Sequence, residues 1–511
     1  MHVLATQLAT LEEADVAVDL GQSPAEVVVL SFSDSDLSAL AAAWQRDADS
    51  LPTLRLASLK RLRHPMSVDL YVESVVVRAK MVIVRCLGGL DYWRYGLERI
   101  ADAARDHGVL FVALPGDDRP DARLAAMSTV AADALDLFDR FFRDGGPDNL
   151  ANALHFAGAL LGRDSPWQPP VPVGPITVLG EPRGACPVAL IVFYRANLMA
   201  ADHEPVLALM SALEREGLAP LAVAVSSLKD RAIEPELRRV IETHRPAVIL
   251  NATAFSAMRA DDTTVLDMAD APVLQVVLCG STREAWAESG RGLSPADLAM
   301  NVVLPELDGR LLTRAISFKA EAPVDPRLEF ASVRHRSEPD RVDYVAHLAA
   351  AWARLRGKPR RERKLALVLS DYPARGGRAG YAVGLDTTAS TLEILRLLRA
   401  EGYDTGTKEW EATDIASLLD RAQSHLRCGN VIVLLQPDRG SAYHDTGAEP
   451  SATYVATYAW LRDGEKIDAL IHLGTHGTLE WLPGKALALS GECWPETVLG
   501  PLPVIYPFIV N

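Results

Sequence analysis

The polar residues best suited to do chemistry lie close together between positions 471 and 485, at the end of an apolar run. His472, His476 and Glu480 are spaced four residues apart, so a continuous helix would place all three on one face. Two glycines interrupt the stretch, however, and make a loop an equally good interpretation. Either geometry can bring two imidazoles and a carboxylate together.

Imidazole and carboxylate groups bind divalent metals such as zinc or cobalt, and they are also the usual proton acceptors near neutral pH. Metal delivery and proton removal are therefore both open as functions of this stretch. A zinc protease motif does not fit, because it needs Glu directly after the first His and Leu473 stands there. A phosphate-binding loop does not fit either, because Ala486 follows Gly484 and Lys485. We therefore expect this chain not to bind ATP itself.

The element that must position these groups is a strand. The apolar run at 467–473 predicts a buried strand, so the polar residues leave its carboxyl end. Open α/β sheets bind ligands at that edge, which favours a functional site over a merely structural role for the histidines.

Arginines follow two further predicted strands of the same region. Arg375 and Arg378 come after the strand at 364–370, and Arg439 comes after the strand at 431–436. Parallel strands would bring all three to the same edge as the histidines. A protein of net charge -15 needs such a local cationic patch to bind an anionic ligand.

The alternation of strand-like and helix-like patterns predicts an α/β fold of several doubly wound parallel-sheet domains around a cleft. We expect an amino-terminal α/β domain at 1–165, a Pro-rich linker at 166–186, a second doubly wound domain at 187–320, a connector with few strand signals at 321–363, and an incomplete α/β domain carrying the histidines at 364–511. In the second domain, a further set of candidate ligand-binding residues follows the first two strands: Tyr194, Arg195, Ser226 and Lys229.

Composition excludes several classes of protein. The 511 residues are 49% hydrophobic, enough for large cores, yet no apolar run approaches a membrane span and no secretory signal is present. We expect a cytoplasmic protein. The five cysteines form no C-x-x-C pair, which argues against a structural zinc site or a disulfide framework. The acidic balance argues against nucleic-acid binding.

The stretch at 471–485 resembles the signature of the large subunit of tetrapyrrole metal chelatases, a family that includes aerobic cobaltochelatase of the CobN type and magnesium chelatase. Residues 19–25 and 64–69 resemble the cobalt branch rather than the magnesium branch. Further stretches that resemble the family lie along nearly the whole chain, at 115–118, 193–195, 225–230, 251–253, 297–301, 372–378, 384–386, 436–440 and 443–445.

The resemblance implies insertion of Co(II) into hydrogenobyrinic acid a,c-diamide. The energy would come from ATP hydrolysis on separate partners, an AAA+ ATPase subunit and its companion subunit. His472, His476 and Glu480 are expected to act in catalysis and as metal ligands, with cobalt as a substrate. The residues expected to bind the tetrapyrrole are Arg375, Arg378, Asp386, Arg439, His444, Lys485, Tyr194, Arg195, Ser226 and Lys229.

The chain departs from the family in length and at single positions. Family members are more than twice as long, Thr475 stands where cobalt-type members often carry Lys, and Ser451 and Ala452 replace a usual Pro-His pair. Two alternatives therefore stay open. The chain is a truncated corrinoid-binding module without chelatase turnover, or it is part of a magnesium chelatase large subunit, which the amino-terminal matches oppose.

Overall fold

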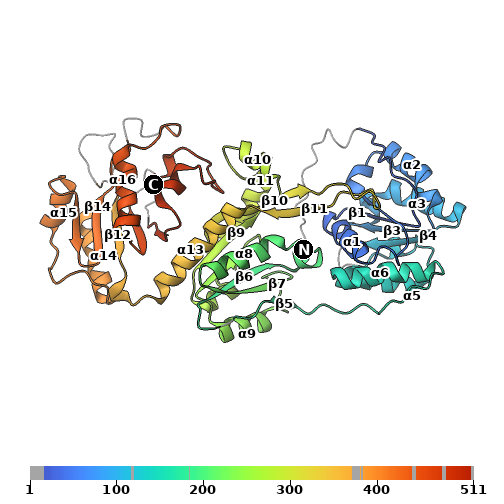
Figure 1. Ribbon diagram of the computed structural model, residues 1–511, viewed down its shortest axis with the longest axis horizontal. Coiled ribbons are helices and arrows are strands. Elements are labelled where there is room, and N and C mark those ends of the chain that lie inside the picture. The colour runs from blue at the N-terminus through green and yellow to red at the C-terminus, as the bar shows by residue number, and fades with distance from the viewer. Residues whose placement is uncertain are drawn as a thin grey trace.

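The computed structural model describes residues 16–116, 120–182, 184–259, 261–370, 380, 384–439, 445–474 and 479–507. Three largely parallel sheets, each covered by helices, follow one another along the long axis of the molecule (Figure 1). The predicted α/β class is confirmed. None of the described helices has the length and apolar character needed to cross a bilayer.

The first sheet has four parallel strands in the order β2-β1-β3-β4. They are β1 (Val27–Ser31), β2 (Leu54–Ser58), β3 (Met81–Cys86) and β4 (Leu110–Pro115). Their helices are α1 (Asp34–Arg46), α2 (Pro65–Ser74), α3 (Arg94–His107), α4 (Ala122–Ala125), α5 (Ala132–Asp144) and α6 (Gly146–Leu160). Helices α1, α5 and α6 pack on one face and α2 and α3 on the other. The strands are therefore largely apolar, as parallel strands buried on both faces are.

The expected Pro-rich linker contributes a strand to the second sheet. Strand β5 (Ile176–Leu179) lies within it and pairs antiparallel with β7 (Ala219–Val225). An edge strand tolerates such a sequence because the prolines flank it and only one side of its backbone needs partners. Part of the stretch predicted to remain outside the domains is therefore ordered against the second one.

The second sheet has seven strands in the order β11-β10-β9-β8-β6-β7-β5, with the two edge strands antiparallel to the rest. The others are β6 (Val188–Tyr194), β8 (Val248–Asn251), β9 (Val273–Leu278), β10 (Leu311–Glu321) and β11 (Val333–Ser337). Their helices are α7 (Arg195–Met199), α8 (Glu204–Arg215), α9 (Glu234–His244), α10 (Arg283–Glu288), α11 (Pro295–Leu298), α12 (Leu304–Glu306) and α13 (Pro339–Gly357). Helices α8 and α13 share one core with the sheet, and α9 packs on the opposite face.

The expected connector at 321–363 is thus largely part of the second domain. Strand β11 pairs with β10, and α13 buries Val342, Val345 and Ala349 in the core that α8 also contacts. This strand was not predicted because its sequence, Val-Arg-His-Arg-Ser, contains no apolar run. An edge strand is held by backbone pairing on one side and does not need one.

The third sheet has five strands in the order β13-β14-β12-β15-β16. They are β12 (Leu365–Leu369), β13 (His425–Cys428), β14 (Val431–Leu435), β15 (Ala469–Leu473) and β16 (Val504–Ile505), with helices α14 (Thr387–Ala400), α15 (Ala412–Leu419), α16 (Ala452–Ala459) and α17 (Trp494–Leu499). Helix α15 is short, and the antiparallel edge strand β13 follows it.

Each sheet reverses its strand order beside its first parallel strand. The reversals lie between β1 and β3, between β6 and β8, and between β12 and β15. Such a switch point opens a crevice at the carboxyl ends of the strands, where doubly wound folds bind their ligands. The fold therefore offers three places for a site.

Candidate functional site

The first histidine of the signature lies at the switch point of the third sheet, which is between β12 and β15. His472 is on β15, and its side chain is buried, with 1% of the residue exposed. Its ring packs against Tyr506 with the ring centroids 4.8 Å apart, and the Tyr506 hydroxyl donates a hydrogen bond of 2.6 Å to Glu480 Oε1. The buried His472 and the exposed Glu480 therefore both contact Tyr506.

Burial sets the protonation state of this imidazole. Loss of solvation lowers the pKa of His472 to about 4, and the negative charge of Glu480 opposes the shift without cancelling it. The ring is therefore neutral near pH 7. Its Nε2 forms no hydrogen bond, which is uncommon for a buried polar atom. A neutral nitrogen with a lone pair can accept a proton or bind a divalent ion.

Two more buried polar atoms lie at the neighbouring strand ends. Ser370 Oγ, after β12, and Gln436 Oε1, after β14, also form no hydrogen bond. Gln436 donates through Nε2 to the hydroxyls of Tyr454 and Tyr458, at 3.3 and 3.0 Å. Burial raises the pKa of Tyr458 to about 12, so this hydroxyl stays protonated. Three buried polar atoms without a hydrogen bond thus lie at the carboxyl ends of the neighbouring strands β14, β12 and β15.

Sequence reasoning did not single out Ser370, Gln436 or Tyr506. Ser370 and Gln436 close the predicted strands at 364–370 and 431–436, so the rule applied to the arginines would have found both. No local signal identified Tyr506, because its role depends on packing against a residue far away in the sequence.

The three predicted tetrapyrrole-binding residues of the third domain that the structure describes all make contacts within the protein. The Arg439 guanidinium is buried and donates to the backbone carbonyls of Trp481, Asp445 and Ala448, at 2.8, 2.8 and 2.7 Å. Asp386 caps the amino terminus of α14. Lys485 Nζ donates to two carbonyls of the second domain and lies 5.1 Å from the ring centroid of Trp286.

The remaining signature predictions fall outside the described residues. They are His476, Arg375, Arg378 and His444. Within the part of the chain that is described, no group of three or more His, Cys, Asp or Glu side chains could hold a metal ion. The metal-ligand set of His472, His476 and Glu480 therefore stays a prediction.

The candidates of the second domain lie elsewhere. Tyr194, Ser226 and Lys229 line a cavity of about 530 Å³, whereas Arg195 is outside that lining and donates to the carbonyl of Gly174. The Tyr194 hydroxyl donates to the carbonyl of Ala254 at 2.9 Å, and burial raises its pKa. This cavity is formed by the first and second domains, whereas the signature belongs to the third. Among the described residues, none of the signature stretch lines this cavity.

Three α/β units, each with a switch point in a largely parallel sheet, define a multidomain α/β protein. A family model described as CobN/Magnesium Chelatase matches residues 139–427 and 422–511, so the chain belongs to this family. The resemblance seen in the sequence is confirmed.

Individual relatives point to the cobalt branch. The chain is 40% identical to the aerobic cobaltochelatase subunit CobN of Sinorhizobium sp, over 100% of this chain and 47% of that protein. It is 26% identical to a magnesium-chelatase subunit of Rhodobacter capsulatus, over 68% and 34%. The catalytic subunit of cobaltochelatase from Mycobacterium tuberculosis superposes with a TM-score of 0.76 at 30% identity, covering 95% of this chain and 46% of that one. The chain thus spans about half the length of the cobaltochelatase relatives it matches.

Proposed function

We propose that this chain is the tetrapyrrole-binding portion of a cobaltochelatase large subunit. It would act in the insertion of Co(II) into hydrogenobyrinic acid a,c-diamide, with ATP hydrolysed by an AAA+ ATPase subunit and its companion. The higher identity to cobaltochelatase than to magnesium chelatase supports this choice of metal.

The observation that carries the proposal is the neutral, buried imidazole of His472 with an unused Nε2 beside the Glu480 carboxylate. A ring that takes up a divalent ion must release protons from its inner nitrogens, and the ion must shed water. The exposed Glu480, oriented by Tyr506, is placed to accept such a proton. His472 offers a lone pair to a proton or to the incoming ion. His476, two residues after Gly474, would complete the set.

A second candidate function is favoured by one observation. Because the chain spans 47% of the Sinorhizobium relative, it can be a corrinoid-binding module that needs further segments for turnover. Such a module would bind the ring but insert no cobalt, even when the ATPase subunits are present. The magnesium alternative would require magnesium insertion into a porphyrin, which the lower identity to the magnesium-chelatase relative disfavours.

The experiment is cobalt insertion by this chain with and without the ATPase subunits, beside a full-length CobN. Ring binding is followed separately through the absorption spectrum of hydrogenobyrinic acid a,c-diamide. We expect Glu480→Gln to lower the insertion rate by about tenfold or more while changing the dissociation constant of the ring little, because it removes a proton acceptor and keeps the shape.

Glu492→Gln is the matched control, since Glu492 is an exposed carboxylate of the same domain and is not part of the signature. It should leave both quantities unchanged. Equal losses of binding and insertion in Glu480→Gln would assign Glu480 to ring binding alone. An absorption spectrum that does not change on mixing would remove the binding claim.

A further inference from the structure

The cavity between the first two domains lies where two switch points face each other. Its walls come from the carboxyl ends of β1 and β3 on one side and of β6, β7 and β8 on the other. The strand-end residues in the lining are Phe32, Asp34, Leu87, Tyr194, Ser226 and Ala252. A volume of about 530 Å³ is within the range of small-molecule sites. Two doubly wound domains thus direct their ligand-binding edges into one space.

Four basic side chains line the cavity, and two of them form no ion pair with a carboxylate among the described residues. Lys60 is paired with Asp34 and Lys319 with Asp202, each at 2.7 Å. Among the described residues, Lys229 and Arg63 have no carboxylate partner, although both line the cavity. Lys229 belongs to the second domain and Arg63 to the first, so the two cations lie on opposite walls. They suit an anionic group held between the domains.

The rest of the lining offers flat apolar surfaces. Phe32 and Tyr92 form an edge-to-face pair in the first domain, with centroids 5.1 Å apart. Phe255 lies in the opposite wall with a φ of 65°, a conformation that is strained for a bulky side chain. Its backbone N–H donates at 2.7 Å to the carbonyl of Met300, which lies in a π-helical turn, Ala299–Val303. Strained backbone and π-turns both concentrate at functional sites.

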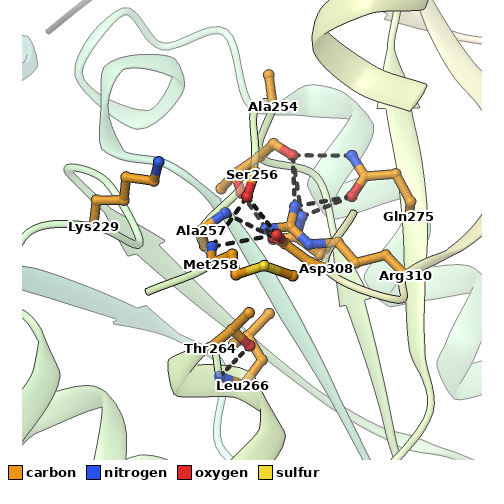
Figure 2. Close-up of polar contacts among 12 residues, drawn as sticks. Lys229, Ala254, Ser256, Ala257, Met258, Thr264, Leu266, Gln275, Asp308 and Arg310 are labelled. Atoms are coloured by element: carbon orange, nitrogen blue, oxygen red, sulfur yellow. Dashed lines mark hydrogen bonds and ion pairs between the residues drawn. The ribbon is translucent and has the colours of Figure 1, made fainter. Parts of the chain in front are cut away.

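A buried polar network fixes this second-domain wall (Figure 2). The Asp308 carboxylate accepts hydrogen bonds from Ser256 Oγ at 2.5 Å, Ala257 N at 2.7 Å and Met258 N at 3.2 Å. It also pairs with Arg310 at 2.6 Å, and the two side chains are only 1% and 2% exposed. Such a buried pair is weak evidence for stability, because desolvation offsets the attraction. Here it orders the loop around Phe255, so this loop would lose less conformational entropy when a ligand binds.

The lining is suited to a carboxylate more than to a phosphate. The loop at 226–230 contains no glycine, whereas phosphate sites commonly use glycine-rich loops that turn backbone N–H groups toward the ligand.

We infer that this cavity is a second binding site, separate from the signature region, for a flat apolar molecule that carries a carboxylate, with Lys229 and Arg63 holding the anionic group from opposite walls. The existence of the cavity follows from the positions of its lining residues and does not depend on the proposed function. Its occupant, a carboxylated tetrapyrrole of the kind the chelatase would handle, rests on the proposed function.

The test is equilibrium binding of hydrogenobyrinic acid a,c-diamide and, separately, of ATP to the full chain. We expect Lys229→Glu to weaken ring binding at this site by about tenfold or more, since a charged hydrogen bond is replaced by repulsion. Ala254→Trp should abolish it by filling the cavity. Arg239→Glu is the matched control, because Arg239 is an exposed cation of the same domain outside the lining, and it should bind as the unmodified chain does. Melting temperatures verify that each variant is folded.

A double variant, His472→Ala with Glu480→Gln, separates this site from the signature. Ring binding that survives in the double variant and is lost when Ala254→Trp is added to it supports the cavity, whatever the fate of the proposed function. Folded Lys229→Glu and Ala254→Trp variants that bind the ring like the unmodified chain would overturn the inference and leave the signature proposal standing. ATP binding that Ala254→Trp removes would overturn the assignment to a carboxylate.

Discussion

At the scale of single residues, the surroundings of a side chain decide what chemistry it can do. His472 and Glu480 lie near the same tyrosine, yet one is buried and neutral and the other is exposed. Arg439 is a residue whose surroundings give it a structural contact in place of the predicted contact with a ligand. It follows a strand end as predicted, but its buried guanidinium is bonded to three backbone carbonyls, so in this structure it orders two loops.

The neutral state of His472 predicts a stability that depends on pH. The pKa of the ring is about 4 in the folded chain and about 6.5 when unfolded, so between these values the unfolded state binds more protons. The free energy of unfolding should therefore fall as the pH falls through this window, by up to about 1.4 kcal/mol per pH unit from this residue.

Chemical denaturation of the unmodified chain and of His472→Gln between about pH 5 and pH 7 measures the contribution of His472 to the pH dependence of the free energy of unfolding. His335, whose burial lowers its pKa to about 3, contributes in the same direction in both proteins and cancels in the comparison. Parallel stability curves for the two proteins would show that His472 does not titrate as described.

At the scale of elements, the carboxyl ends of β12 and β15 approach unusually closely. A Cβ added at Gly474 would lie 2.0 Å from Ser370 Oγ and 2.3 Å from Ser370 Cβ. Gly474 is therefore needed for the contact between the two strands that flank the switch point, in addition to any freedom that it gives the segment after it.

Gly474→Ala should destabilise the chain by about 1–3 kcal/mol, because neither strand can move without disturbing the sheet. Adding Ser370→Gly should restore part of that loss, since it removes both clashing atoms. Gly357→Ala is the control, because no heavy atom lies within 4 Å of the added Cβ there. Urea denaturation of the two single variants and the double variant gives the coupling between the two positions. Additive effects would contradict the predicted contact.

At the scale of the whole molecule, the segment after β10 reaches back from the second domain to the first. Glu329 accepts hydrogen bonds from Ser23 N at 2.7 Å, Ser23 Oγ at 2.6 Å and Arg55 Nη2 at 2.8 Å. Leu328 is fully buried in the core of the first domain. The segment between β10 and β11 reaches the first sheet (Figure 1). We expect this clamp to hold together the two domains that line the cavity.

Glu329→Ala should loosen the first domain from the second by about 1–3 kcal/mol, because it leaves the largely buried Arg55 without its carboxylate. We expect a larger radius of gyration by small-angle scattering, faster proteolytic cleavage of the chain near residue 329, and weaker binding of the ring in the cavity. Asp49→Ala removes only an exposed ion pair with Arg327 and should change none of these. An unchanged radius and unchanged binding would mean that Leu328 and its neighbours hold the domains without this pair.

The sequence alone predicted the interior strands and the repeated α/β architecture. Parallel strands buried on both faces need apolar runs, and β1, β6, β12 and β15 each have one. The edge strands β5, β11 and β13 were not predicted, because backbone pairing on one side makes few demands on side chains. The long signature at 471–485 was also sufficient to indicate the family.

Only the tertiary structure decided which candidate residues meet. A strand end fixes the edge of the sheet at which a side chain emerges, but packing fixes where that side chain points and what it contacts. Tyr194, Ser226 and Lys229 were predicted beside one sheet, and the docking of the first domain gave them an opposite wall with Arg63. The family resemblance implied that Asp386 and Lys485 bind the ring; in the structure Asp386 caps a helix and Lys485 joins the third domain to the second. Contacts between distant segments come from the way cores and domains pack, and no local pattern in the chain encodes them.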